Sequence, residues 1–199
     1  MMMNDMLKKY NNSSLKDTSK DKKEYMTNSE KIKVINFDNL SKKGYSKMLR
    51  LKVQSFPFKT NDALYLDVEN NKFIFIEFKN GSFSVNEKNF KEKELPQLEL
   101  KIIGSMYILQ EITGKSFKEL REITDYILVY NKEKNPHIFS AVDMGNYIVN
   151  LGTLNNKKIR NLKEGISFGL EKFKGYCFKN VHTYSKEEFE EKFVRKYEK

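Results

Sequence analysis

Several residue types that commonly build functional sites are scarce in this chain of 199 residues. The single cysteine, Cys177, excludes a disulfide framework and every zinc site made from several cysteines. Two histidines, His137 and His182, are too few for a His-rich metal site or an HNH-type nuclease. Glycine-rich phosphate-binding loops of the GxxxxGK[ST] and GxGxxG types are also absent. Chemistry in this chain must therefore rest on other side chains.

Long apolar runs are missing as well. No stretch approaches the roughly 18 apolar residues that span a bilayer, and the first residues, MMMNDMLKKYNNSS, lack the apolar core of a secretory signal. Hydrophobic residues make up 39% of the chain, enough for one core. We expect a cytoplasmic protein without membrane contact. Residues 30–199 are expected to form a single domain after a polar, disordered or weakly ordered leader over 1–29.

The charge balance is strongly basic, with 37 Lys and Arg against 27 Asp and Glu and a formal net charge of +10. Cationic side chains that neutralise phosphates release counterions, which drives nucleic-acid binding. However, few of the basic residues are arginine, and abundant Lys, Asn and Ile are typical of an AT-rich genome. The distribution of charge is therefore better evidence than its total.

The basic residues gather in a stretch without acids between Asn39 and Asn61. Within it, residues 49–54 alternate between apolar and polar types, which predicts a half-buried strand with one basic face. Such a stretch is either a solvated face or a surface that follows a phosphate backbone. A second basic face is predicted on a helix over 157–173. The residues expected to contact nucleic acid, in the acid-free stretch and on a helix predicted over 95–113, are Lys42, Lys43, Lys47, Arg50, Lys52, Lys59, Gln97 and Lys101.

Local patterns predict most of the remaining elements. Residues 95–113 carry a helical apolar stripe between Pro96 and Gly114, which suit the start and the end of a helix. Residues 125–130 form a short apolar run typical of a buried strand, and 176–184 also predict a strand. Ser116 with Glu119, and Ser185 with Glu188, are capping-box pairs that each predict the start of a helix.

A hairpin in the first half of the domain carries the residues of greatest chemical interest. Two apolar runs, 62–67 and 72–79, flank an acidic, Asn-rich break and predict two antiparallel strands. Glu77 and Lys79 lie two positions apart, so their side chains share one face. The antiparallel pairing brings Asp62, at the start of the first strand, beside both. Two carboxylates suit a hard cation such as Mg²⁺ or Mn²⁺, which lowers the pKa of a bound water, and a nearby ammonium can orient that water.

This arrangement resembles the signature of the PD-(D/E)XK nucleases. Asp62 is followed after fourteen residues by Glu77-Phe78-Lys79 at the end of an apolar strand. The resemblance covers about residues 40–131 and implies an α/β domain with the restriction endonuclease-like α-β-β-β-α-β core and a mixed central sheet flanked by helices. It also implies that Asp62, Glu77 and the carbonyl of Phe78 bind the metal and that Lys79 positions the attacking water.

The chain departs from that signature in three ways. Asn61 stands where the signature has proline. Some branches carry a further acid on the first core helix, for which only Glu30 and Asp38 lie nearby. RecB-like branches have Gln-x-x-x-Tyr on the following helix, whereas here Gln97 is followed by Lys101. Acid-x-Lys also occurs elsewhere in this lysine-rich chain, so the hairpin context, rather than the tripeptide, supports the interpretation.

The function expected on these grounds is Mg²⁺- or Mn²⁺-dependent hydrolysis of phosphodiesters. DNA is a better candidate substrate than RNA, endonucleolytic attack is favoured, and a homodimer would allow both strands to be cut. A defence, toxin or mobile-element role would rest on analogy alone. The alternatives are a catalytically inert fold that binds nucleic acid or protein, a basic accessory protein that docks on an acidic partner, and an edge hairpin whose Glu77 and Lys79 simply face water.

Overall fold

The structure is a computed structural model that describes residues 5–21, 23–50, 58–82, 94–135 and 168–198. Within these ranges no helix combines the length and the apolar character needed to cross a bilayer. Several sequence predictions fall outside the described residues. They concern Lys52, most of the strand predicted over 49–54, His137 and most of the helix predicted over 157–173.

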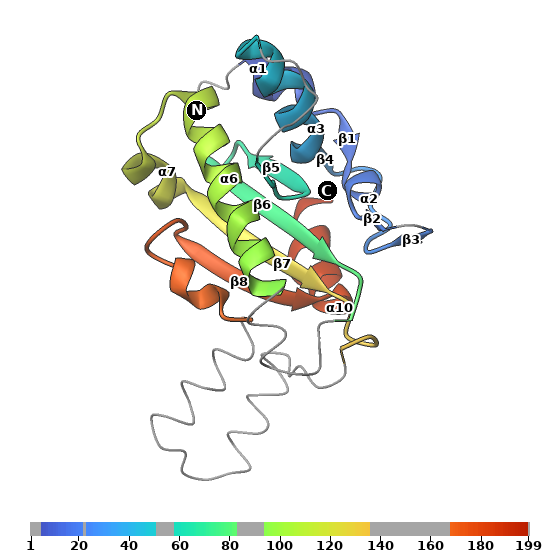
Figure 1. Cartoon of the computed structure of the whole chain (residues 1–199). Coiled ribbons are helices and arrows are strands. Elements are labelled where there is room, and N and C mark those ends of the chain that lie inside the picture. The colour runs from blue at the N-terminus through green and yellow to red at the C-terminus, as the bar shows by residue number, and fades with distance from the viewer. Residues whose placement is uncertain (1–4, 22, 51–57, 83–93, 136–167, 199) are drawn as a thin grey trace, which may run out of the picture.

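The domain is a mixed α/β structure with a six-stranded central sheet flanked by helices (Figure 1). The strand order is β1-β4-β5-β6-β7-β8. The pairs from β1 to β6 are antiparallel, and β6–β7 and β7–β8 are parallel, so the sheet is mixed. A separate antiparallel pair, β2–β3, lies outside it. The strands are β1 (Ser13–Ser14), β2 (Lys20–Asp21), β3 (Glu24–Tyr25), β4 (Lys33–Asn36), β5 (Ala63–Asp67), β6 (Lys72–Lys79), β7 (Thr124–Tyr130) and β8 (Asn180–Ser185).

Helices cover both faces of the sheet. In Figure 1, α6 crosses in front of β6 and β7, and the C-terminal helical segment lies behind them. Two capping boxes begin helices, at Ser116 for α7 and at Ser185 for α10, as their spacing predicts. The helical elements are α1 (Asp5–Tyr10), α2 (Leu15–Thr18), α3 (Phe37–Asn39), η1 (Leu40–Tyr45), α4 (Ser46–Met48), α6 (Leu95–Thr113), α7 (Phe117–Ile123), η4 (Leu170–Phe173), α10 (Lys186–Phe189), η5 (Glu190–Val194) and α11 (Arg195–Tyr197).

The predicted hairpin is confirmed. β5 and β6 pair antiparallel, with Ala63 opposite Ile76 and Asp67 opposite Lys72, and the chain turns between them. Side chains alternate between two cores, as the pleat of a strand requires. Ile74 and Ile76 face the core under the C-terminal helix, whereas Phe73 and Phe75 face the core under α6. The end of β6 therefore presents Glu77 on the α6 side.

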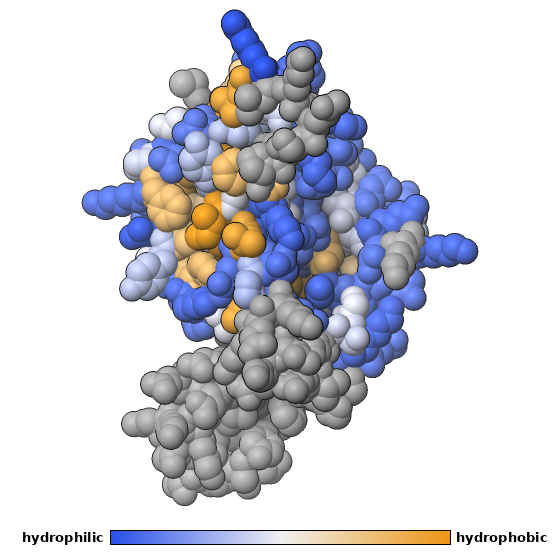
Figure 2. All heavy atoms as spheres, in the orientation of Figure 1, coloured by the Kyte–Doolittle hydropathy of each residue, from blue (hydrophilic) through white to orange (hydrophobic). Residues whose placement is uncertain are grey.

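Helix α6 occupies the range that the sequence predicts, Leu95–Thr113. It ends at Gly114, whose φ of 66° is a left-handed conformation that glycine adopts without a steric penalty. Its inner face buries Leu98, Ile102 and Leu109 against the sheet. Its outer face leaves apolar side chains exposed, and Figure 2 shows such side chains gathered on the face where α6 lies. They are Leu100, Ile103 and Tyr107.

Two expectations for the ends of the chain need correction. The segment predicted as a weakly ordered leader contains short elements that pack on the domain, with Leu7, Leu15 and Met26 buried. Its few apolar residues are spaced too irregularly to form a recognisable period, although Leu7, Leu15 and Met26 each reach a core. The strand predicted over 176–184 starts later, as β8 at Asn180, because residues 176–179 form a turn and an isolated bridge with Lys174.

Candidate active site

The start of the site is a close contact between α6 and the chain that leads into β5. Gly104 lies against this segment so closely that a Cβ at position 104 would be 2.4 Å from the carbonyl oxygen of Lys59. The next helical residue, Ser105, accepts a hydrogen bond from the backbone N–H of Asn61 at 2.8 Å. A proline at position 61 could not donate this bond, which gives the departure from the signature a structural reason. The contact fixes the backbone immediately before Asp62.

Asp62 is anchored to the end of the neighbouring strand. Its Oδ2 accepts a hydrogen bond from the N–H of Phe78 at 2.8 Å, in agreement with the register that places the start of β5 beside the end of β6. Burial raises the pKa of Asp62, and the Lys101 ammonium and the Phe78 N–H oppose that rise. The sequence prediction that Asp62 and Glu77 lie side by side is therefore correct in its geometry.

Lys101 on α6 joins the two carboxylates. Its Nζ lies 2.5 Å from Oε1 of Glu77 and 3.1 Å from Oδ1 of Asp62. The Glu77 side chain is only 3% exposed, whereas those of Asp62 and Lys101 are each 26% exposed. The site is thus closed around Glu77 and open to solvent on the side of Asp62 and Lys101.

The charged groups of the cluster shift the pKa values of one another. Burial and the negative charge of Asp62 raise the pKa of Glu77 to about 8, although Lys101 and Lys79 act in the opposite direction. Burial acts to lower the pKa of Lys101, but the two carboxylates outweigh it and hold that pKa above its usual range. Glu77, the buried carboxylate of the pair, therefore retains a proton to a higher pH than an ordinary glutamate.

The donor set suits a hard divalent cation. One carboxylate oxygen of Asp62 and one of Glu77 both contact the same atom, Nζ of Lys101, so the two oxygens are close enough to contact one cation. Oε2 of Glu77 is buried and accepts no hydrogen bond from the described part of the chain. Mg²⁺ often binds to one or two carboxylates together with waters and substrate phosphate. Over the described ranges no group of three or more His, Cys, Asp or Glu side chains could hold a metal ion, so any ion here would depend on this pair.

The remaining predicted catalytic residues lie at the end of β6. Lys79 follows Glu77 by two positions on the strand, so it is placed on the same face, and its charge lowers the pKa of Glu77. Phe78 packs its ring against Phe189 of α10, on the opposite face, while its N–H contacts Asp62. The carbonyl of Phe78 as a metal ligand stays a prediction.

The residues predicted to contact nucleic acid are spread over two neighbouring regions. Lys42, Lys43, Lys47 and Arg50 are exposed on and just after the helical segment η1–α4. Lys59 forms a hydrogen bond with Gln97, which links the segment before β5 to the first turn of α6. Gln97, Lys101 and Ser105 do share a helix face toward the site, but only Lys101 reaches the carboxylates. Their role in nucleic-acid binding stays a prediction.

Two further groups lie near the site, of which the sequence prediction names only Asp38, as a candidate for the further acid. Tyr126 on β7 is fully buried, its hydroxyl has no hydrogen-bond partner among described residues, and burial together with Glu77 and Asp62 raises its pKa well above the ordinary value. Asp38 on α3 accepts a hydrogen bond from Thr60 at 3.2 Å, and its charge also raises the pKa of Asp62. The apolar run 125–130 identifies the strand, but no local pattern shows which of its side chains faces a carboxylate on another strand.

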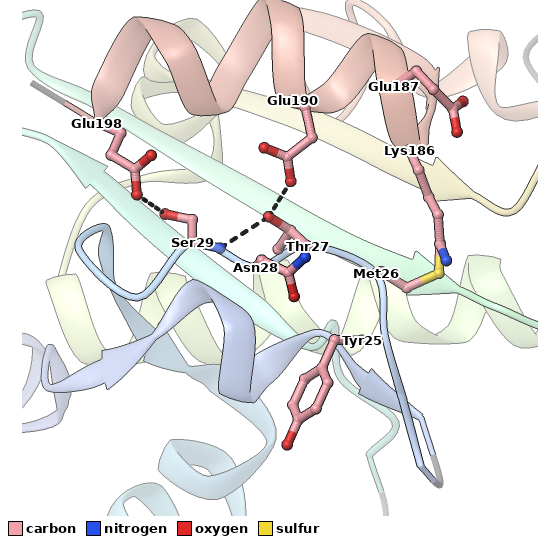
Figure 3. Close-up of a pocket in the computed structure, with 9 residues that line it drawn as sticks. All are labelled: Tyr25, Met26, Thr27, Asn28, Ser29, Lys186, Glu187, Glu190 and Glu198. Carbon is pink, nitrogen blue, oxygen red and sulfur yellow. Dashed lines mark hydrogen bonds between the residues drawn. The ribbon is translucent and has the colours of Figure 1, made fainter.

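A cavity of about 400 Å³ lies elsewhere, between residues 25–29 and the C-terminal helical segment (Figure 3). Thr27 donates a hydrogen bond to Glu190, and Ser29 donates one to Glu198 at 2.8 Å. These bonds join the N-terminal segment to the end of the chain. Because the two carboxylates are engaged by these hydroxyls, we interpret the cavity as a gap beside a structural contact.

Comparisons with known proteins identify no relative. No protein-family model matches the chain, and neither the curated proteins nor the solved structures contain a match. The function must be argued from the geometry of the site.

Proposed function

We propose that this chain is a Mg²⁺- or Mn²⁺-dependent nuclease with a restriction endonuclease-like fold, and that DNA is its substrate. The observation that carries the proposal is that the carboxylates of Asp62, just before β5, and Glu77, near the end of β6, both contact the same ammonium, that of Lys101. The six-stranded mixed sheet and the order of β5, β6, α6 and β7 are compatible with that fold.

Each residue has a distinct role in the proposed reaction. Asp62 and Glu77 would hold the cation, and a bound divalent cation would lower the pKa of a water and offset charge on the scissile phosphate. Lys79 orients the attacking water and stabilises developing negative charge. The exposed lysines of η1–α4 contribute affinity for the phosphate backbone without sequence information.

The proposal is tested by cleavage assays on duplex DNA, single-stranded DNA and RNA, each with Mg²⁺, Mn²⁺ or EDTA. Glu77→Gln and Lys79→Met are expected to lower metal-dependent cleavage by about 10² or more, the order of magnitude seen when one group that stabilises a transition state is removed. Lys72→Met, at the opposite end of β6, and Glu69→Gln, in the exposed hairpin turn, are the matched controls and are expected to retain activity. Cleavage that survives both site substitutions would refute this assignment.

A second candidate is a catalytically inert domain that binds nucleic acid. The observation in its favour is that Lys101 already provides a counter-charge for the carboxylate pair, while the described residues supply no third metal ligand. Salt-sensitive DNA binding without cleavage, and without a thermal shift on addition of Mg²⁺ or Mn²⁺, would favour this candidate.

A further inference from the structure

The ammonium of Lys101 lies where a cation shared by Asp62 and Glu77 would have to lie. Its distance of 2.5 Å to Glu77 falls within the roughly 2.0–2.6 Å of hard-cation ligands, and its distance of 3.1 Å to Asp62 is about 0.5 Å longer than that range. An ammonium and a divalent ion that use the same oxygens repel each other strongly and cannot both occupy this position. The carboxylate pair can therefore hold one or the other.

We propose that Lys101 is the resident counter-cation of the site and that a divalent cation binds by displacing its ammonium from Asp62 and Glu77. This inference rests on the proposed function, because it takes the same carboxylate pair as the metal site. It makes Lys101 a residue that sets metal affinity, a role separate from that of Lys79.

The geometry allows this exchange. Glu77 is almost fully enclosed, but Lys101 and Asp62 are 26% exposed, so the ammonium can leave toward solvent while Glu77 stays in place. The lysine side chain is long and flexible, and its stem can remain against the sheet while the charged end moves to water. An incoming ion has the same open side available.

The charges favour the exchange in one direction. With the ammonium in place, Asp62 and Glu77 both contact the single positive charge of Lys101. A divalent cation would neutralise both carboxylates and would also free the ammonium for solvent or for a substrate phosphate. By linkage, whatever stabilises the ammonium-bound form must weaken metal binding by the same free energy.

The test is direct measurement of Mn²⁺ binding by calorimetry and by the EPR signal of free Mn²⁺, on the full chain without nucleic acid. Lys101→Met removes the charge and keeps an unbranched apolar side chain, and we expect it to tighten Mn²⁺ binding by about tenfold, equivalent to about 1.4 kcal/mol. It should also enlarge the rise in melting temperature that Mn²⁺ causes. Lys72→Met removes a comparable ion pair, 2.9 Å from Asp125 at the far end of the hairpin, and should leave Mn²⁺ affinity unchanged.

The outcomes separate the two proposals. If the wild-type chain binds Mn²⁺ and a folded Lys101→Met variant binds it equally or more weakly, Lys101 organises the carboxylates and the displacement is refuted. If neither protein binds Mn²⁺, the metal-dependent function itself fails. If Lys101→Met does not fold, Mn²⁺ binding is measured on Lys101→Gln instead. The wild-type chain is then also followed by NMR of its lysine ε-methylene groups. Addition of Mg²⁺ must then move the Lys101 signal, and an unmoved signal in the metal-bound chain refutes the displacement.

Discussion

The contact at Gly104 allows a prediction in which two effects of opposite sign compete. Gly104→Ala should raise helix stability by about 0.8–1.0 kcal/mol, because alanine is the better helix former. The added methyl would, however, lie 2.4 Å from the carbonyl oxygen of Lys59 and 3.3 Å from Cβ of Phe58. The closer atom belongs to the backbone, so the whole segment before Asp62 must move. Overpacking of this kind typically costs about 1–3 kcal/mol, and we expect the steric effect to dominate.

Urea denaturation followed by circular dichroism measures the result. Because the clash is with backbone, the upper part of the overpacking range applies, about 2–3 kcal/mol. Less the helix gain of about 1 kcal/mol, Gly104→Ala is expected to lower the free energy of unfolding by about 1–2 kcal/mol. Gly81→Ala is the control, because in the described part of the chain no atom beyond its two neighbours lies within 4 Å of the added methyl, and it should unfold like the wild-type chain. A Gly104→Ala variant as stable as the wild type, or more stable, would show that α6 and the segment before Asp62 are not in this close contact.

Three more outcomes are expected from the hydrogen bonds and charges around the sheet. Ser105→Ala removes the acceptor of the buried Asn61 N–H and should cost about 1–3 kcal/mol in urea denaturation; an unchanged midpoint would contradict that hydrogen bond. Because the folded chain raises the pKa of Glu77 from 4.5 to about 8, it keeps a proton between these values that the unfolded chain has released. The free energy of unfolding should therefore fall as pH rises through this window, by up to about 1.4 kcal/mol per pH unit. In denaturation series at pH 5 to 8, Glu77→Gln should flatten this slope, and equal slopes for variant and wild type would refute the raised pKa of Glu77. Tyr197→Phe removes the hydrogen bond to Asp67, 2.8 Å long, and should lower thermal stability by about 1.5–3 kcal/mol, the range for a bond to a charged group; an unchanged melting curve would show that the bond contributes nothing.

The parts of the fold that the sequence predicts correctly are those with local signals. The hairpin of β5 and β6 has two apolar runs and a polar turn, and α6 has a proline at its start and a glycine after its end. The juxtaposition of Asp62 and Glu77 follows from that hairpin alone, since antiparallel pairing determines which residues face each other.

The parts that sequence patterns miss depend on contacts between distant segments. Lys101 contacts Asp62 and Glu77 only because α6 packs on the sheet in one particular rotation about its axis. Helical spacing predicts which residues share a face of α6, but not which of them contacts the two carboxylates. Leu7 and Leu15 are buried by strands and helices far along the chain, so their local surroundings resemble a polar leader. Tertiary packing decides both cases, and no local propensity encodes it.

The separation of Lys101 from its partners along the chain has a consequence for folding. The hairpin can close from its turn at residues 68–71, because its two strands are adjacent in sequence. Its open end, however, brings the carboxylates of Asp62 and Glu77 together, while the lysine that balances them lies 39 and 24 residues further on. Repulsion should keep that end frayed until α6 docks. The candidate site would then be among the last parts of the sheet to close. By microscopic reversibility, the end of the hairpin that carries Asp62 and Glu77 would be among the first parts to open when the chain unfolds.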